Sequence, residues 1–407
     1  MARELTWPPQ CSIRCVALKT TANTIGTDCL GQRATRKLMC VFARVIYTGT
    51  SAVNESYLNF RGNTIVGISS TAEGEIQGRY DVITPALIDS HAHIGLARAA
   101  EPTREAEFSE QCDSITAAAD ALDSIQMDDQ SFVRSCRAGV LYSCVLPGSM
   151  NLIAGRCPVI RNFAGHGAQA FVAQAGIKAA LGYNPTAARD WKGQRPSTRM
   201  GALAHLRRSL SGVCEKLSAN GTLTASEQVL AAIITRRETL RVHVHKADDI
   251  DALLRLVDEF RVRVIVEHAG ATDDVSLFRE LRRRDIAVNY GPVDSFAYKV
   301  ELKRKSWRNI AHLLESGVRY GLMSDHPVSS QRMLLFQLRW FIRCGLDKSE
   351  AIGVITNKNA AILGISDKLG RLTRSKWASF VCWNGDPFDV THHPVAVYAE
   401  GALIAAE

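Results

Sequence analysis

The sequence lacks the features that mark membrane, secreted and repetitive proteins. No run approaches the ~18 consecutive apolar residues that a membrane-spanning helix needs. No apolar segment precedes Pro8 and Pro9 as a signal peptide would require. There is also no internal repeat of about 20 to 50 residues and no low-complexity tract. We therefore expect a soluble protein that is neither secreted nor bound to a membrane.

Cysteine and charge patterns disfavour two further classes. The eleven cysteines are scattered from Cys11 to Cys382 without a CxxC motif, which suits a reducing compartment and predicts a cytoplasmic protein. No block of five like charges occurs, and acidic residues are interleaved with the basic ones that give a formal net charge of +8. We interpret this excess as solvated helix faces, and we expect no nucleic-acid partner.

What is present is an ordinary globular composition over a considerable length. The 407 residues are 46% hydrophobic and 22% charged, which disfavours disordered, collagen-like and coiled-coil proteins. At one domain per ~150 residues, the length allows two or three domains, or one barrel-sized domain with an appendage. Residues 1–38 contain only Glu4 and Asp28 as acids, and we predict that they form a poorly ordered extension.

Both ends of the remaining chain have β character. Residues 41–90 read as short extended runs separated by glycine-containing turns, and the runs FVCWN and VAVYAEGALI repeat this pattern near the C-terminus. We predict a small β-sandwich built from both ends, with residues 39–84 and 366–407 as its parts.

The middle of the chain alternates short apolar runs with segments of helical spacing. Runs such as VIVEHAG and YGLMSDHP alternate with amphipathic segments such as DIDALLRLVDEF. Over roughly 280 residues, this alternation is typical of a parallel α/β sheet, and its length fits a closed (β/α)₈ barrel of the TIM type. We predict this barrel for residues 85–365, with a helical insertion over 185–240 near the site.

Titratable side chains fall where predicted strands end. His91 and His93, in ALIDSHAHIG, are two residues apart and would point to the same side of a strand, so they could clamp a metal ion. A bare HxH match is weak, but further groups end separate predicted strands and would converge on one mouth of a barrel. These groups are Lys178, His243 with His245, His268 and Asp325. Taken singly, each also has an ordinary structural interpretation.

The motifs together resemble the amidohydrolase superfamily, in particular its branch related to imidazolonepropionase and the binuclear prolidase-like amidohydrolases. The resemblance covers about residues 41–407 and includes HAHIG, PGSMNLIAG, VHVHKADDI, SDHP and TNKNAAILGI. It departs from the family pattern near the C-terminus, where RSKWASFVCW replaces the usual small and acidic residues. That departure concerns packing of the predicted sandwich and leaves the strand-end motifs intact.

The resemblance implies two divalent metal ions, with Zn²⁺ as the first expectation and Mn²⁺ or Co²⁺ as alternatives. His91 and His93 would bind one ion together with Asp325, and His243 and His268 would bind the second.

It also implies a chemical role for two of the groups. Lys178 would carry a CO₂-derived carbamate that bridges both ions, because an ammonium repels metals whereas a carbamate offers anionic oxygen. A metal-bridging hydroxide would attack the substrate carbonyl. Asp325 would be both a metal ligand and the base that takes the proton of the water and returns it to the leaving amine.

Other residues near these motifs are candidates for substrate contact. In VHVH, both histidines face the same side, so the ligand on the fifth strand stays open; we favour His243 and keep His245 as substrate-facing. His326 could orient Asp325 or touch the substrate. Arg199 could hold a substrate carboxylate bidentately. Weaker candidates are Tyr183 and Tyr290.

The sequence therefore predicts a metal-dependent amidohydrolase that cleaves a C–N bond in a small-molecule amide. One alternative is a deaminase of the same superfamily, which typically uses one metal and no lysine ligand. The other is a catalytically inactive scaffold homologue, which would generally have lost ligands. The family often forms symmetric assemblies, so a homo-oligomer is compatible with the sequence. The loop sequences do not identify the substrate.

Overall fold

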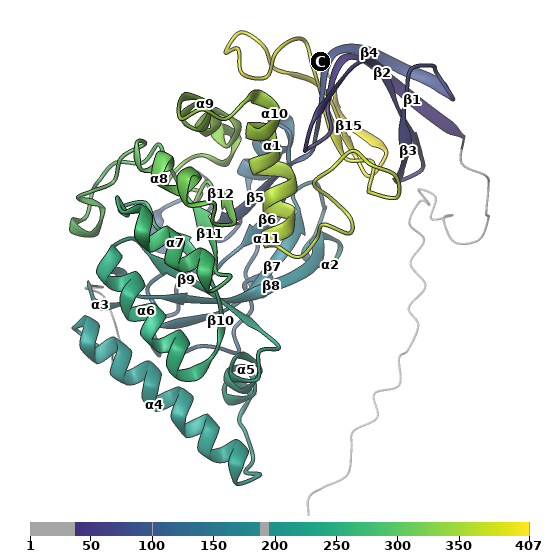
Figure 1. Cartoon of the computed structure of the whole chain (residues 1–407). Coiled ribbons are helices and arrows are strands. Elements are labelled where there is room, and N and C mark those ends of the chain that lie inside the picture. Colours follow the sequence, from purple (N-terminus) through teal and green to yellow (C-terminus); the bar gives the residue numbers. More distant parts are fainter. Residues whose placement is uncertain (1–36, 100, 188–194, 407) are drawn as a thin grey trace, which may run out of the picture. The chain divides into compact units, whose positions relative to one another are not determined.

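A computed structural model of the protein describes residues 37–99, 101–187 and 195–406, and Figure 1 shows their mixed α/β fold. The predicted N-terminal extension falls almost wholly outside the described residues. Within these ranges, no helix has both the length and the apolarity needed to cross a membrane.

One sheet joins the two β-rich ends of the chain. Its seven strands run in the order β15-β14-β13-β4-β1-β2-β3. β4 pairs with β1 in parallel and with β13 in antiparallel, so the N-terminal and C-terminal segments share a continuous ladder. The predicted domain boundaries stay a prediction. The strands are β1 Leu38–Tyr47, β2 Ala52–Arg61, β3 Thr64–Ser69, β4 Glu75–Pro85, β13 Phe380–Trp383, β14 Pro394–Ala399 and β15 Ala402–Ala406.

The second sheet is a nearly closed eight-stranded barrel, in the order β12-β11-β10-β9-β8-β7-β6-β5. Its two edges meet through backbone bonds, because Asp325 N–H donates to His91 O at 3.0 Å and His93 N–H donates to His326 O at 2.8 Å. The strands are β5 Leu87–Ala92, β6 Val140–Val145, β7 Ile153–Arg161, β8 Phe171–Ala180, β9 Thr239–Val244, β10 Arg263–His268, β11 Ala287–Tyr290 and β12 Tyr320–Leu322.

One strand departs from the parallel sheet that the alternating pattern predicts. β7 runs antiparallel to both β6 and β8, whereas the other neighbouring pairs of this sheet are parallel. The connections through residues 146–152 and 162–170 are shorter than the dozen or more residues that a parallel crossover needs. The chain therefore returns directly, and β7 fills the third place in the barrel.

The helices follow the barrel strands and cover them (Figure 1). α6 shows why: its residues Ile250, Leu253 and Leu254 recur at helical spacing and are buried in the barrel core. The predicted helical stretch over 185–240 contains most of α3, all of α4 and α5, and the start of β9. The helices are α1 Gln130–Arg137, α2 Gly167–Ala170, α3 Asn184–Ala187, α4 Arg199–Ser218, α5 Ala225–Ile234, α6 Ala247–Phe260, α7 Val275–Arg283, α8 Asn309–Ser316, α9 Arg339–Arg343, α10 Lys348–Gly353 and α11 Asn359–Ile362.

Thiol reactivity tests the closed core around β6. Cys112 is exposed, whereas burial raises the pKa values of Cys136 and Cys144 to about 12. The thiolate is the reactive form, and at pH 8 only about one in 10⁴ of such thiols is ionised. We expect iodoacetamide at pH 8 to modify Cys112 in the folded protein and to spare Cys136 and Cys144 until denaturant is added, as read by peptide mass spectrometry. Rapid native labelling of Cys144 would contradict this core.

Candidate metal centre

The predicted ligand residues lie together where barrel strands end. They come from the carboxyl ends of β5, β8, β9 and β10 and from the turn after β12. Their donor atoms form two groups, each with its ligand atoms within 4.8 Å of one another. The first group is His91, His93 and Asp325, and the second is His243, His245 and His268.

The first group is oriented by its hydrogen bonds. His93 Nδ1 lies 2.7 Å from Leu146 O, and because a carbonyl oxygen only accepts, Nδ1 carries the proton and Nε2 keeps its lone pair. His91 Nδ1 is 2.9 Å from Glu267 Oε2, which favours the same tautomer. Both Nε2 atoms lie 3.4 Å from Asp325 Oδ1. Two imidazole lone pairs thus face one carboxylate oxygen.

The second group adjoins the first. The His268 ring centroid is 5.1 Å from that of His91, 4.4 Å from that of His243 and 4.6 Å from that of His245. His268 Nδ1 donates to Gly291 O at 2.9 Å. Burial, the largest influence, lowers the pKa values of His243, His245 and His268 well below the ordinary range. These imidazoles are therefore neutral at pH 7, which is the form that binds metals.

Lys178 is a buried amine next to these imidazoles. It is fully buried, and its Nζ lies 3.2 Å from His91 Nε2. Burial lowers its pKa. Within the described ranges, no carboxylate oxygen lies within 4.0 Å of Lys178 Nζ, the limit for an ion pair. An unpaired ammonium in such a place would be costly, so the surroundings suit a neutral or derivatised amine.

The donor sets fit divalent metal ions. Neutral imidazoles and carboxylates are the ligands that Zn²⁺ and related ions use in proteins. His243 Nε2 and His245 Nδ1 are buried and have no hydrogen-bond partner among the described residues. Leaving such atoms unsatisfied costs free energy, and coordination would remove that cost.

A buried ion pair that the sequence reasoning missed supports the first group. Glu267 accepts from His91 through Oε2, and its Oε1 pairs with Arg241 Nη2 at 2.7 Å. Arg241 Nη2 also donates to Ser90 O at 2.9 Å. Arg241 and Glu267 are both fully buried. The available signal was alternation, since Arg241, His243 and His245 share one face of β9 and its continuation.

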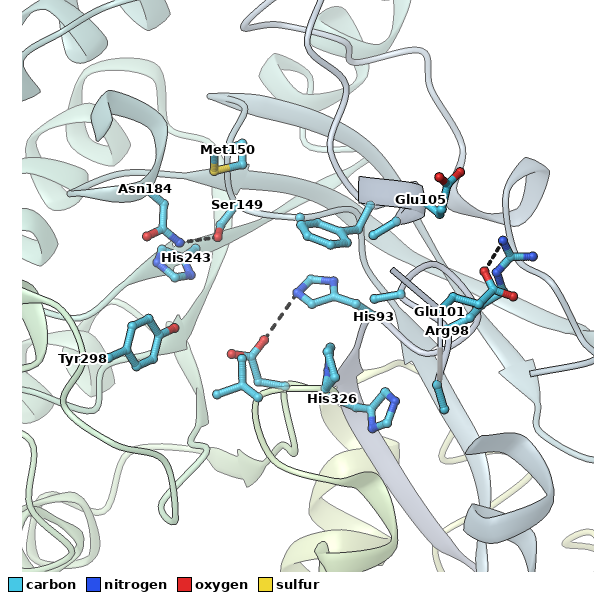
Figure 2. A pocket seen from close by; sticks show the side chains of 18 of the residues that line it. His93, Arg98, Glu101, Glu105, Ser149, Met150, Asn184, His243, Tyr298 and His326 are labelled. Atoms are coloured by element: carbon cyan, nitrogen blue, oxygen red, sulfur yellow. Dashed lines mark hydrogen bonds and ion pairs between the residues drawn. The ribbon is translucent and has the colours of Figure 1, made fainter. Parts of the chain in front are cut away.

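A cavity of about 540 Å³ opens over both groups. Figure 2 shows His93 and His243 on opposite sides of it, with Tyr298 and His326 also at its wall. The volume lies in the range of small-molecule sites. The deeper residues His91, Lys178, His245 and His268 do not line it.

The remaining candidates occupy different surroundings. His326 lines the cavity, and burial lowers its pKa to about 4. Tyr183 also lines the cavity, whereas Tyr290 packs in the core against Phe341. Arg199 does not line the cavity. Its Nη1 donates to Asp249 Oδ1 at 2.9 Å, so its substrate role stays a prediction that this contact does not support.

The sequence reasoning also missed Lys299 and Glu301, on the segment after β11. Lys299 lines the cavity, and its Nζ lies 2.8 Å from both Glu301 Oε1 and Asn184 Oδ1. Glu301 is 3% exposed. Their segment, YKVEL, alternates apolar and polar residues as a strand would, but Val300–Leu302 forms a short helix. The pattern therefore carried no signal that the segment would fold against the strand ends.

Comparisons with known proteins agree with this architecture. A family model described as "Amidohydrolase family" matches residues 206–404. The curated protein "Amidohydrolase tasK" from Hapsidospora irregularis is 23% identical over 353 residues, which cover 78% of this chain and 36% of that protein. The chain thus spans about a third of that relative's length.

Solved structures share the fold over most of the chain. An amidohydrolase from Thermotoga maritima MSB8 has a TM-score of 0.84 and 26% identity, covering 91% of this chain and 100% of the other. A Xaa-Pro dipeptidase with bound methionine has a TM-score of 0.57 and 14% identity, covering 90% and 99% of the two chains, and shows the fold alone. The fold is that of an amidohydrolase barrel, and the match of residues 206–404 to the family model agrees with the resemblance to the amidohydrolase superfamily.

Breaking the buried ion pair should be strongly destabilising. Arg241→Met would leave Glu267 as an uncompensated buried charge, which typically costs about 3–5 kcal/mol. We expect urea denaturation to show a loss of this size, partly recovered in Arg241→Met/Glu267→Leu. As a control, Arg207→Met removes an exposed pair with Glu259 and should cost at most ~1 kcal/mol. Equal effects of both single substitutions would contradict the structural role of the buried pair.

Proposed function

We propose that the protein is a metal-dependent hydrolase that cleaves a C–N bond in a small-molecule amide. The observation that carries this proposal is the pair of adjoining donor groups, with a buried amine beside them, at the floor of a cavity. The match to the amidohydrolase family model and the similarity to amidohydrolase tasK support the same reaction class. The proposed compartment is the cytoplasm.

The proposed centre holds two divalent ions, with Zn²⁺ first among the candidates. His91, His93 and Asp325 would hold one ion, and His243 and His268 of the second group would hold the other. When bound, such ions lower the pKa of water and polarise a carbonyl.

Lys178 is proposed to carry a carbamate. Its lowered pKa favours the free amine, which can attack CO₂. A new N–C bond then forms, and one proton leaves the nitrogen. The resulting anionic group would remove the cost of a buried ammonium and contribute oxygen to both ions.

Asp325 is proposed to move the proton. Burial acts to raise its pKa, yet the pKa is lowered to about 2 by the surrounding groups, so the carboxylate is ionised at neutral pH. It lines the cavity, where it can meet both water and substrate. The carboxylate would take a proton from the attacking water and deliver it to the leaving amine nitrogen.

Metal removal and reconstitution test the function directly. The protein is stripped with a chelator, reloaded with Zn²⁺, Mn²⁺ or Co²⁺ in bicarbonate, and assayed against N-acyl amino acids, dipeptides and cyclic amides. We expect amide hydrolysis that disappears on chelation and returns with metal. Release of ammonia from an amino-substituted heterocycle, without amide cleavage, would indicate a deaminase instead. Inactivity with every ion and substrate class would favour a non-catalytic scaffold.

Substitution of Asp325 tests its role as base. Asp325→Asn should reduce turnover by ~10² to 10⁴, the usual contribution of general acid–base catalysis, because an amide cannot accept the proton at neutral pH. Circular dichroism should show an unchanged fold. The matched control Asp251→Asn alters an exposed carboxylate of α6 and should leave turnover unchanged. A near-normal rate for Asp325→Asn would assign the base to another residue.

A further inference from the structure

A carboxylate outside the predicted ligand set faces the second group of histidines. Glu301 lies in the short helix Val300–Leu302 and is 3% exposed. Its Oε1 is 3.6 Å from His243 Nε2 and 4.0 Å from His245 Nε2. Figure 2 shows Tyr298, from the same segment, at the cavity wall near His243. The segment after β11 thus brings a buried carboxylate to the end of β9.

Two of the facing atoms have few partners. His243 Nε2 and Glu301 Oε1 are buried and form no hydrogen bond with any described residue, although Oε1 has an ion pair with Lys299 at 2.8 Å. Two ligands that each lie ~2.1 Å from one ion can be at most ~4.2 Å apart. Both distances from Glu301 to the imidazoles fall below this limit. One ion could therefore contact Glu301 and either histidine.

The other oxygen of Glu301 is held by the fold. Oε2 accepts a hydrogen bond from Tyr183 N–H at 3.0 Å. The preceding residue, Gly182, has φ +84°, and a Cβ there would come within 2.8 Å of Oε2. Only glycine meets both conditions without strain, so the backbone can approach the carboxylate closely. This anchoring leaves Oε1 directed at the histidines.

We propose that Glu301 is a ligand of the second metal ion. With His243, His245 and His268, it completes a four-coordinate set of three imidazoles and one carboxylate, a set that suits Zn²⁺. The proposal rests on the proposed function in that the protein must bind metal. It makes both histidines of VHVH ligands, and it lets this ion bind without a carbamate on Lys178.

Metal binding by a reduced site tests the assignment. In His93→Ala/Lys178→Ala, the first group and the carbamate are both disabled, so a remaining tight ion belongs to the second group. We expect this variant to bind one Co²⁺ per chain and to show the intense visible absorption of four-coordinate Co²⁺. Adding Glu301→Gln should weaken Co²⁺ and Zn²⁺ binding by at least ~10²-fold, because loss of even an outer-shell partner costs 10–100-fold. It should also change the absorption spectrum.

Two further variants make the result decisive. Glu105→Gln applies the same chemical change to a cavity carboxylate on the far side from His243 (Figure 2) and should alter neither affinity nor spectrum. Lys299→Met/Glu301→Gln removes the buried pair together, so it tests the ligand without leaving an unpaired ammonium. This double substitution should lose metal affinity as Glu301→Gln does, with a folded circular dichroism spectrum.

The outcomes separate the two proposals. If wild-type protein binds two ions and hydrolyses amides, but Glu301→Gln in the reduced site keeps its affinity and spectrum, Glu301 merely positions Lys299 and the ligand assignment is wrong. If the reduced site binds no ion while the wild type does, the second ion depends on the carbamate, and the assignment is also wrong. If wild-type protein binds no metal under any condition, the proposed function itself fails.

Discussion

The buried ion pair between Arg241 and Glu267 is the constraint on which the candidate centre depends. Removing two charges from water costs several kcal/mol per ion, and only close pairing with further hydrogen bonds offsets it. Here the pair connects β9 to β10, reaches β5 through Ser90 O and His91, and reaches β11 through Asn289. Four strands are thus held at one depth of the barrel. Because Glu267 accepts a hydrogen bond from His91 Nδ1, it also determines that His91 Nε2 faces the site.

A second buried carboxylate positions the turn after β12, where the last strand of the barrel meets β5. Asp89 accepts hydrogen bonds from the backbone N–H and the hydroxyl of Ser324 and from Gln331 Nε2. Burial raises its pKa to about 6 despite these bonds. The turn that it holds includes Asp325, whose φ of +55° lies in the left-handed region. A strained position at a proton-transferring residue requires such support from its surroundings.

The chemical character of the centre comes from burial as much as from residue type. Imidazoles in water are partly protonated near neutral pH, but those of His243, His245 and His268 are held neutral. The amine of Lys178 is shifted towards its free form by the same desolvation. Asp325 stays ionised, because its pKa is lowered to about 2 although burial acts in the opposite direction. One desolvated pocket therefore holds lone pairs and negative charge together, which is the environment that a cation requires.

Local pattern was sufficient to locate the strand-end donors, because strand periodicity places residues such as His91 and His93 on one side and parallel strands bring their ends together. The sequence pattern could not predict the direction of β7, since an apolar run looks the same in either direction. Only the short connections to β6 and β8 make this strand antiparallel to its neighbours. The pattern could not find Glu301, because the alternation of YKVEL indicates a strand whereas Val300–Leu302 is a short helix. It also did not reveal that Arg199 pairs with Asp249. Such contacts join residues far apart in the chain, between loops whose course depends on the packing of the whole barrel. Residue type and spacing thus determined the donors, and tertiary packing decided their partners, protonation and access to the cavity.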